Sequence, residues 1–248
     1  MHKKICNICQ KLPRKIKKFY RQIFSYNAIK YNFSLKNHYW QTRKKNNNYE
    51  FEPNDFQIER AKLLNIYINN NDIILDIGSG DGSQLTAISK ICPNIEIIGS
   101  DKDKYACELM KKNNFKCFFL KNDDFIFDLI KEYSPSCVTL FEVLEHMESP
   151  EELIIRLLNF SNLKIFASVP NSGYFVHRTR YLFGRFPIQW IANPNEHLRF
   201  WTLKDLNWWI NYLDIKRETI IIPYKGIPFL NKFFPNLFAK GLFLVIKK

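Results

Sequence analysis

The chain has 248 residues, of which 46% are hydrophobic and 16% aromatic. This composition supports the packed core of one α/β domain with extensions, and it excludes a disordered chain. The formal net charge is +13, but residues 1–49 hold thirteen Lys or Arg and no Asp or Glu, whereas the rest carries twenty-four of each sign. No apolar run reaches the length that a membrane-spanning helix needs.

Residues 1–49 therefore form a basic arm attached to a charge-balanced domain, residues 50–248. Apolar residues recur in the arm at helical spacing: Ile8, Leu12, Ile16, Phe19, Tyr20, Ile23 and Phe24. A basic amphipathic helix favours an anionic surface, which can be lipid headgroups, nucleic acid or another protein. A helix that packs on the domain with its lysines in water is the alternative. Because lysines and arginines interrupt every apolar run near the N-terminus, we expect no secretory leader. We expect a cytoplasmic protein that can also lie at a membrane surface.

The first element of the domain is the stretch NDIILDIGSGDGS, residues 71–83. The apolar run 73–77 predicts a buried parallel strand. Gly78, Gly80 and Gly82 then predict a turn that brings the backbone close to a ligand, and a helix follows. A strand, a glycine turn and a helix N-terminus together are typical of a nucleotide-binding unit. The spacing is GxGxG, and Ser83 stands where a dinucleotide fingerprint has its last glycine.

Further strands and helices alternate along the chain. Strands are predicted at 95–101, in the stretch 115–125 with its end at Asn122-Asp123, at 137–141 and at 163–171. Helices are predicted at 102–113, 124–133 and 149–160. This alternation predicts an α/β fold with a parallel sheet and helices on both faces. Ligands bind outside the carboxyl ends of the strands in such sheets, and Asp101 stands at one of those ends. Its carboxylate can accept hydrogen bonds from both ribose hydroxyls of a nucleoside.

The motifs ILDIGSGDGS, GSD, NDDF and LFEVLEHMESPEE, in this order and spacing, resemble those of class I S-adenosylmethionine-dependent methyltransferases, over about residues 54–248. The resemblance implies a Rossmann-like, seven-stranded, mostly parallel sheet. Its two closing antiparallel strands would be RETIIIP (217–223) and KGLFLVIKK (240–248). It also implies a transferase that uses S-adenosyl-L-methionine as its cofactor.

The same resemblance assigns the cofactor residues. Asp76 and the backbone of Gly78 and Gly80 would hold the methionine moiety, and Asp101 would bind the ribose. Asp123 would face the adenine amino group, with Phe125 against the ring. Acids suit the amine and the ribose of the cofactor, and backbone amides suit its carboxylate. Methyl transfer itself is an in-line displacement that needs mainly proximity and alignment.

The stretch FEVLEHM, residues 141–147, places Glu142, Glu145 and His146 at i, i+3 and i+4, which share one face of a helical turn. A solvated polar face, a part of the cofactor rim and a part of a metal site are three open interpretations. The full Glu-x-x-Glu-His pattern resembles two metal-dependent groups, the ubiquinone-biosynthesis O-methyltransferases and the small-RNA 3′-terminal 2′-O-methyltransferases. In the RNA group a downstream His completes the site, and His197 in NPNEHLRFWTLKDL (193–206) stands in the matching position.

Two carboxylates and two imidazoles suit Mg²⁺, Mn²⁺ or Fe²⁺. The resemblance therefore implies a metal site of Glu142, Glu145, His146 and His197, with Glu142, His146 and His197 as catalytic residues. A general base would take the proton of a hydroxyl acceptor, and a metal would acidify the bound oxygen, so such a site favours O-methylation.

Residues 172–200 form a segment inserted after the fifth strand, where acceptor-binding caps usually lie. The segment is rich in aromatic and basic side chains, and arginines suit phosphate or carboxylate groups. The candidate acceptor-binding residues are Tyr174, His177, Arg178, Arg180 and Arg199. A packing cap with solvated arginines is the alternative. The run PNSGYFVHRTRYLFGRFP also resembles the MetW-like group of methyltransferase-fold proteins, some of which act with a partner protein.

Three functions follow as expectations. The first is metal-assisted O-methylation of a small hydroxylated or phosphorylated metabolite, such as a sugar or a surface-glycan precursor. The second is RNA 2′-O-methylation with the basic arm holding the RNA, which ranks lower because the domain is charge-balanced. The third is a MetW-like subunit that binds the cofactor and acts with a partner protein.

Overall fold

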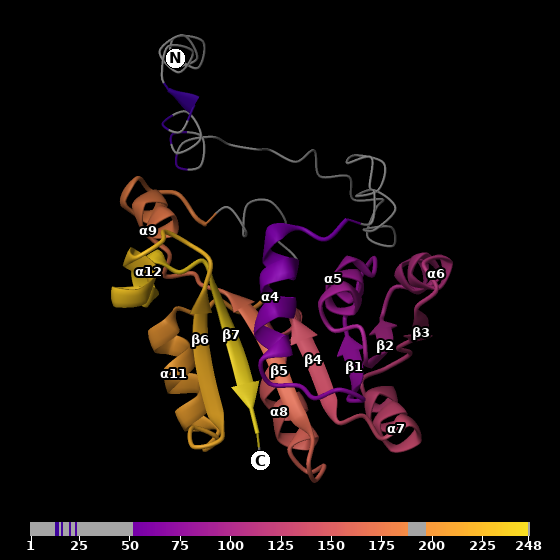
Figure 1. Cartoon of the computed structure of the whole chain (residues 1–248). Helices are drawn as coiled ribbons and strands as arrows, with labels where there is room; N and C mark the ends of the chain where they lie inside the picture. Colours follow the sequence, from indigo (N-terminus) through magenta and orange to yellow (C-terminus); the bar gives the residue numbers. More distant parts are fainter. Residues whose placement is uncertain are drawn as a thin grey trace.

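The computed structural model describes residues 13, 14, 16, 20, 23, 52–187 and 197–247. Within them a seven-stranded sheet has the order β3-β2-β1-β4-β5-β7-β6, with helices on both faces (Figure 1). The strands are β1 (Ile73–Ile77), β2 (Glu96–Asp101), β3 (Lys116–Phe119), β4 (Cys137–Phe141), β5 (Lys164–Pro170), β6 (Thr219–Tyr224) and β7 (Gly241–Ile246). The helices are α4 (Asp55–Asn65), α5 (Ser83–Ile91), α6 (Lys104–Lys112), α7 (Asp124–Tyr133), α8 (Pro150–Leu157), α9 (Phe175–Leu182), α11 (Leu203–Tyr212), α12 (Leu230–Phe233) and α13 (Pro235–Phe238), with a 3₁₀ turn η2 (Leu144–His146).

The pairing of the strands confirms the predicted fold class. Strands β1 to β5 pair in parallel, and β7 pairs antiparallel to both β5 and β6. One predicted strand is longer than the observed one, because β3 ends at Phe119 and not at Asn122-Asp123. The Asn122 side chain accepts a hydrogen bond from the backbone N–H of Phe125, so this segment belongs to the start of α7.

The alternation of buried residues along the strands builds a separate core on each face of the sheet. Ile74 packs with α4 and α5 on one face, whereas Leu75 packs with α7, α8 and α11 on the other. Both residues are almost completely buried. Burial on both faces explains why the central strands read as continuous apolar runs.

Helix α4 has no counterpart among the predicted elements. It begins with a capping box, in which the Asn54 side chain accepts from backbone N–H groups and the Gln57 side-chain oxygen accepts from the backbone N–H of Asn54. The helix carries Arg60 into a buried position against the sheet. This arginine contacts residues of the candidate site, as described below.

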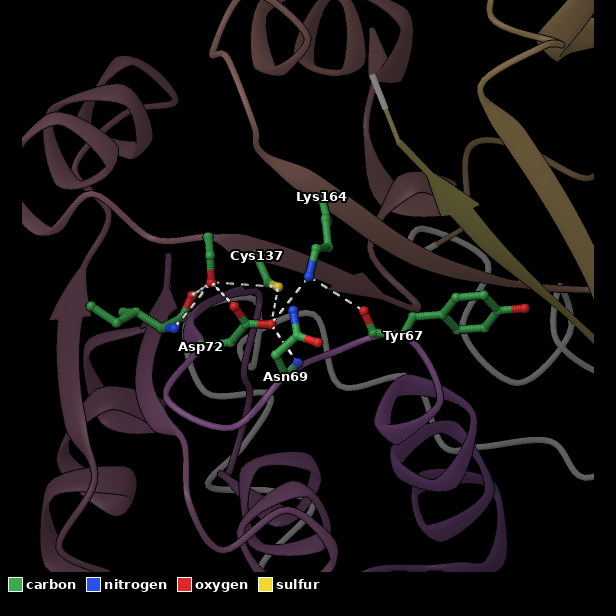
Figure 2. Close-up of polar contacts among 7 residues, drawn as sticks. Tyr67, Asn69, Asp72, Cys137 and Lys164 are labelled. Atoms are coloured by element: carbon green, nitrogen blue, oxygen red, sulfur yellow. Dashed lines mark hydrogen bonds and ion pairs between the residues drawn. The ribbon is translucent and has the colours of Figure 1, made fainter.

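A cluster of polar groups joins the loop before β1 to the amino-terminal ends of β4 and β5 (Figure 2). The Asp72 carboxylate accepts from the backbone N–H of Asn69 at 2.8 Å, from the Ser136 hydroxyl at 2.8 Å and from Lys164 Nζ at 3.2 Å. Lys164 also donates to the carbonyl of Tyr67. Burial raises the pKa of Asp72, but these hydrogen bonds outweigh it, so its pKa lies below the usual range.

We expect Asp72→Ala to lower the free energy of unfolding by about 1–3 kcal/mol, because partly buried donors of Ser136 and Lys164 lose their acceptor. The loss will shrink as the pH falls below about 4, since a lowered native pKa stabilises the fold only while the carboxylate is ionised. Urea unfolding at pH 7 and pH 3 measures both effects. Asp124→Ala is the control, because Asp124 forms an exposed ion pair with Arg156. Equal losses for the two variants would contradict the structural role of Asp72.

Most of residues 1–49 and residues 188–196 of the cap lie outside the described part of the chain. Of the predicted amphipathic arm, Ile23 is buried against Tyr174 and Val176 at the start of α9, and Ile16 is exposed. The guanidinium of Arg180 donates to the Ile23 carbonyl at 2.9 Å. None of the described helices is long and apolar enough to cross a bilayer.

Candidate functional site

The glycine turn between β1 and α5 lies at the carboxyl edge of the sheet. Gly78 has φ +75°, and a Cβ there would lie 2.6 Å from a methyl carbon of Val143. The turn is fixed by hydrogen bonds from Gly78 N and Ser79 N to the Ser100 carbonyl. Only glycine fits both the backbone angle and the close approach, so the turn and the FEVLEHM segment are in direct contact.

Asp76 is the buried acid at the end of β1. Its carboxylate accepts a hydrogen bond from the Thr139 hydroxyl, and its carbonyl accepts from Ser79 and Ser100 hydroxyls. Burial raises the pKa of Asp76 to about 6, although the hydrogen bonds oppose the shift. A carboxylate in this environment gains from a cationic ligand that would replace the lost water.

Asp101 ends β2 beside the same turn. One carboxylate oxygen accepts from Gly80 N at 2.8 Å, and the other accepts from Asp103 N at 2.8 Å. Each oxygen can accept more than one hydrogen bond, so both remain capable of accepting from a pair of hydroxyls. Burial raises the pKa of Asp101.

Asp123 and Phe125 lie further along this edge, at the start of α7. Asp123 is half-exposed and forms an ion pair with Lys102 Nζ at 2.8 Å. Phe125 is partly buried and packs on the core beneath the edge. The structure thus lines up all the predicted cofactor residues along the carboxyl ends of β1, β2 and β3.

The pKa of Asp76 predicts how cofactor binding depends on pH. If the ionised carboxylate holds the cofactor's ammonium group, the dissociation constant of S-adenosylhomocysteine will rise as the pH falls below about 6, by about tenfold per pH unit at most. Calorimetric titrations between pH 5 and pH 8 measure this slope. Asp76→Asn should bind more weakly and remove most of the dependence. A slope unchanged in Asp76→Asn would assign the titration to another group.

Glu142 does not continue an α-helical turn with Glu145 and His146. It has φ +58°, in the left-handed region, and the 3₁₀ turn η2 begins only at Leu144. Its carboxylate accepts from the Ser168 hydroxyl at 2.8 Å and lies 3.3 Å from a guanidinium nitrogen of Arg60. The expected shared helical face is therefore absent, because the left-handed residue separates Glu142 from the turn.

Glu145 is the most deeply buried acid of this segment, with 1% of its surface exposed. Among the described residues, neither of its carboxylate oxygens has a hydrogen-bond partner. One ligand atom from each of Glu145, His146 and His197 lies within 4.8 Å of the other two. The two imidazole rings approach edge to face, with centroids 4.7 Å apart. A buried carboxylate that lacks donors and faces two imidazoles fits a divalent cation.

Backbone hydrogen bonds bring His197 to this cluster from a distant part of the chain. The N–H groups of Leu198 and Arg199 both donate to the Glu145 carbonyl, at 2.7 and 3.1 Å. Trp201 then forms a parallel bridge with Asn171, directly after β5. The position of His197 is therefore fixed by main-chain contacts.

Burial shifts the pKa values of Glu145 and His197 in opposite directions, and each shift favours the neutral form of the side chain. Burial, and then the charge of Glu142, raise the pKa of Glu145 well above its usual range. Burial, and then His146, lower the pKa of His197 to about 4. His197 is consequently neutral at pH 7 and can offer a lone pair to a metal or a proton.

The predicted acceptor-binding residues do not form one group. Tyr174 and His177 are buried, and burial together with Arg180 and Lys240 lowers the pKa of His177 to about 4. Arg180 is 1% exposed and donates to the carbonyls of Phe186 and Ile23, which is a packing role. Arg178 is exposed and donates to the Gly173 carbonyl, whereas Arg199 contacts the Glu148 carbonyl and Glu151.

Arg60 and Ser168 are contacts of the site that the sequence did not indicate. Arg60 donates to Gln84 at 2.9 Å and to the Tyr224 hydroxyl at 3.3 Å, besides its ion pair with Glu142. These partners are far from Arg60 in the sequence and have no recognisable spacing to it. A lone arginine in a helix with a weak hydrophobic pattern offers no signal for such a role.

A family model described as a methyltransferase domain matches residues 21–214. The chain belongs to this family. It is a class I S-adenosylmethionine-dependent methyltransferase, as the motifs predicted. No curated protein matches this methyltransferase in sequence.

Solved structures share the fold of the methyltransferase. A SAM-dependent methyltransferase from Archaeoglobus fulgidus has a TM-score of 0.60 and 17% identity, over 85% of this chain and 100% of its own. The small RNA methyltransferase HEN1 has a TM-score of 0.55 and 21% identity, over 77% of this chain and 25% of its own. The plantazolicin methyltransferase BpumL, solved with SAH, has a TM-score of 0.52 and 18% identity, over 97% of this chain and 99% of its own. At these identities the likeness extends to the fold alone.

Proposed function

We propose that this methyltransferase transfers the methyl group to a hydroxyl oxygen of a small hydroxylated or phosphorylated metabolite, such as a sugar or a surface-glycan precursor, with a divalent cation at the site. The observation that carries the proposal is Glu145, a buried carboxylate without donors that lies within 4.8 Å of ligand atoms of His146 and His197. Burying an unpaired carboxylate is costly, and a bound cation would compensate its negative charge. One carboxylate and two imidazoles suit Fe²⁺ or Mn²⁺, and Mg²⁺ would need further oxygen ligands from water or the acceptor.

The chemistry needs the acceptor oxygen in line with the cofactor's methyl group and sulfur. The oxygen attacks the methyl carbon, the carbon–sulfur bond breaks, and S-adenosylhomocysteine leaves. Val143 lies against Gly78 of the glycine turn, so the Glu145 cluster adjoins the predicted cofactor site. Because the two sites adjoin, an acceptor held by the cluster would lie close to the methyl group of the cofactor, as in-line transfer requires.

The residues around the cluster have separate parts in the proposal. Glu145, His146 and His197 would hold the cation, which would supply positive charge that lowers the pKa of a bound hydroxyl. Glu142 is held by Arg60 and Ser168, and it adds negative charge beside the cluster. His197, neutral at pH 7, is able to ligate or to accept the acceptor's proton.

The cap supports an anionic acceptor. Arg178 is exposed on α9 with its Nε fixed on the Gly173 carbonyl, and Arg199 follows two residues after His197. A guanidinium has further N–H donors for a phosphate or a carboxylate. Arg180 is assigned to packing, and His177 to the interior of the cap.

Transfer of labelled methyl groups to a panel of acceptors tests the proposal. The panel contains a catechol, a sugar phosphate, a primary amine and a single-stranded RNA, each with and without EDTA. We expect transfer to a hydroxyl acceptor, loss of transfer with EDTA and recovery on addition of Mg²⁺ or Mn²⁺. Transfer to the amine that is indifferent to EDTA would overturn the proposal.

RNA 2′-O-methylation is the second candidate. The basic stretch 1–49 and the structural likeness to HEN1 support it, and the same cluster would serve its chemistry. Transfer of the labelled methyl group to the single-stranded RNA of the panel would select this candidate, provided that salt and removal of residues 1–49 both reduce the transfer.

A further inference from the structure

The end of the molecule that carries α9 and α12 exposes large apolar side chains. Leu182 is 84% exposed, Phe229 77%, Phe233 70% and Phe234 61%. We call these four residues the α9/α12 surface. Figure 1 shows α9 and α12 at the same end of the molecule. Phe175 of α9 also packs on Phe238 of α13, the helix that directly follows α12.

This surface lies at the carboxyl edge of the sheet. Tyr224, the end of β6, pairs with Gly241, the start of β7, and Gly241 pairs with Pro170, the end of β5. The connection 225–240, which holds α12, therefore lies at the edge that also carries the glycine turn. A partner docked there approaches the molecule on the side of the candidate site.

The backbone holds one of the aromatic residues outward at an energetic cost. Phe229 has φ +71° and ψ −59°, and Leu230 N donates to the Pro228 carbonyl at 2.9 Å. This is a classic γ-turn, which is rare and strained for a bulky residue. Strain at an exposed phenylalanine points to a role for that side chain outside the fold.

The charge around the surface is of one sign. Residues 172–187 and 225–240, which carry α9 and α12, contain six Lys or Arg and no Asp or Glu, and of these six only Arg180 is buried. Lys232 is exposed on α12 between the phenylalanines, and Arg178 is exposed on α9. Apolar side chains within a basic surround match an interface whose interior is apolar and whose surface is anionic.

From this combination we infer that the α9/α12 surface docks on an anionic lipid bilayer, with Leu182, Phe229 and Phe233 entering the headgroup region. An aliphatic residue at the most exposed position favours lipid over stacked bases, which need aromatic platforms. The docked orientation turns the carboxyl edge of the sheet toward the membrane. An acceptor that is itself lipid-linked or amphiphilic would then reach the site from the interface. The inference is independent of the proposed metal chemistry.

Co-sedimentation of the full-length protein with vesicles tests the inference. Vesicles of phosphatidylcholine are compared with vesicles that also contain phosphatidylglycerol. We expect binding to the anionic vesicles, and a loss of about tenfold or more in the partition coefficient for the double variant Phe229→Ser/Phe233→Ser. Lys232→Gln should weaken binding to the anionic vesicles alone. Circular dichroism confirms that each variant is folded.

The matched control is Trp208→Ser/Tyr212→Ser, because these stacked aromatics of α11 are 65% and 70% exposed and lie outside the α9/α12 surface. This variant should bind vesicles as the wild type does. Equal binding by the folded Phe229→Ser/Phe233→Ser variant and the wild type would overturn the inference, since the basic arm would then account for all binding. Absence of vesicle binding by the wild type would also overturn it. Binding of single-stranded RNA is measured in parallel, and a double variant that loses RNA binding but keeps vesicle binding would overturn the inference as well.

Discussion

Asp101→Ala is expected to weaken the binding of S-adenosylmethionine and S-adenosylhomocysteine by about a hundredfold or more, because two charge-assisted hydrogen bonds to the ribose would be lost. The Asp101 carboxylate ends β2 and is oriented by Gly80 N and Asp103 N. Calorimetric titration of the product nucleoside measures the loss directly, without an acceptor.

Asp103→Ala is the control for this loss. Asp103 is two residues away and caps α6 through hydrogen bonds from Tyr105 N and Ala106 N. Removal of the cap should cost about 1 kcal/mol of stability and leave the affinity within about threefold. If both variants lose affinity equally, local structure and not the Asp101 carboxylate determines binding.

Glu145→Gln is expected to have effects of opposite sign on activity and on stability. Methyl transfer should fall by about a thousandfold or more, because the cluster loses its one anionic ligand among Glu145, His146 and His197. The free energy of unfolding of the metal-free protein should rise by about 1–2 kcal/mol, since a buried carboxylate without donors is replaced by a neutral amide. Urea unfolding in EDTA and a methyl-transfer assay measure the two effects.

Glu142→Gln is the matched variant, three residues earlier in the same segment. Because Glu142 is paired with Arg60 and Ser168, its replacement should lower stability and leave a buried guanidinium without its counter-charge. If Glu145→Gln also lowered the free energy of unfolding, the Glu145 carboxylate would be stabilising the metal-free fold. That result would contradict its proposed role as a ligand that lacks a partner until a cation binds.

The fold could be predicted because its signals are local. The run 73–77 and the glycines after it are read directly from the sequence, and β1 and the turn follow it residue by residue. The end of β3 could not be placed, because Asn122 has the composition of a turn but its role as a cap of α7 depends on the backbone geometry. Helix α4 was missed because its hydrophobic pattern is weak, and its start depends on a capping box.

The sequence indicated which residues belong to the candidate site, but not how they are arranged. The spacing of Glu142, Glu145 and His146 predicted one helical face, but the left-handed backbone at Glu142 turns that side chain to Arg60. The approach of His197 depends on two hydrogen bonds to the Glu145 carbonyl, which no spacing rule encodes. The different environments of Arg178 and Arg180, one exposed and one buried, arise from packing that brings Ile23 to α9.

Titration of Mn²⁺ into metal-stripped protein saturated with S-adenosylhomocysteine tests whether Glu145, His146 and His197 bind a metal. We expect one Mn²⁺ per chain, with binding lost in the double variant Glu145→Gln/His197→Ala and retained in Trp208→Ser/Tyr212→Ser. Tight binding of the product nucleoside without any binding of Mn²⁺, Mg²⁺ or Fe²⁺ would rule out the metal site. In that event Glu145, His146 and His197 would be part of the cofactor-binding edge. Nitrogen and carbon would then be candidates for the methylated atom alongside oxygen.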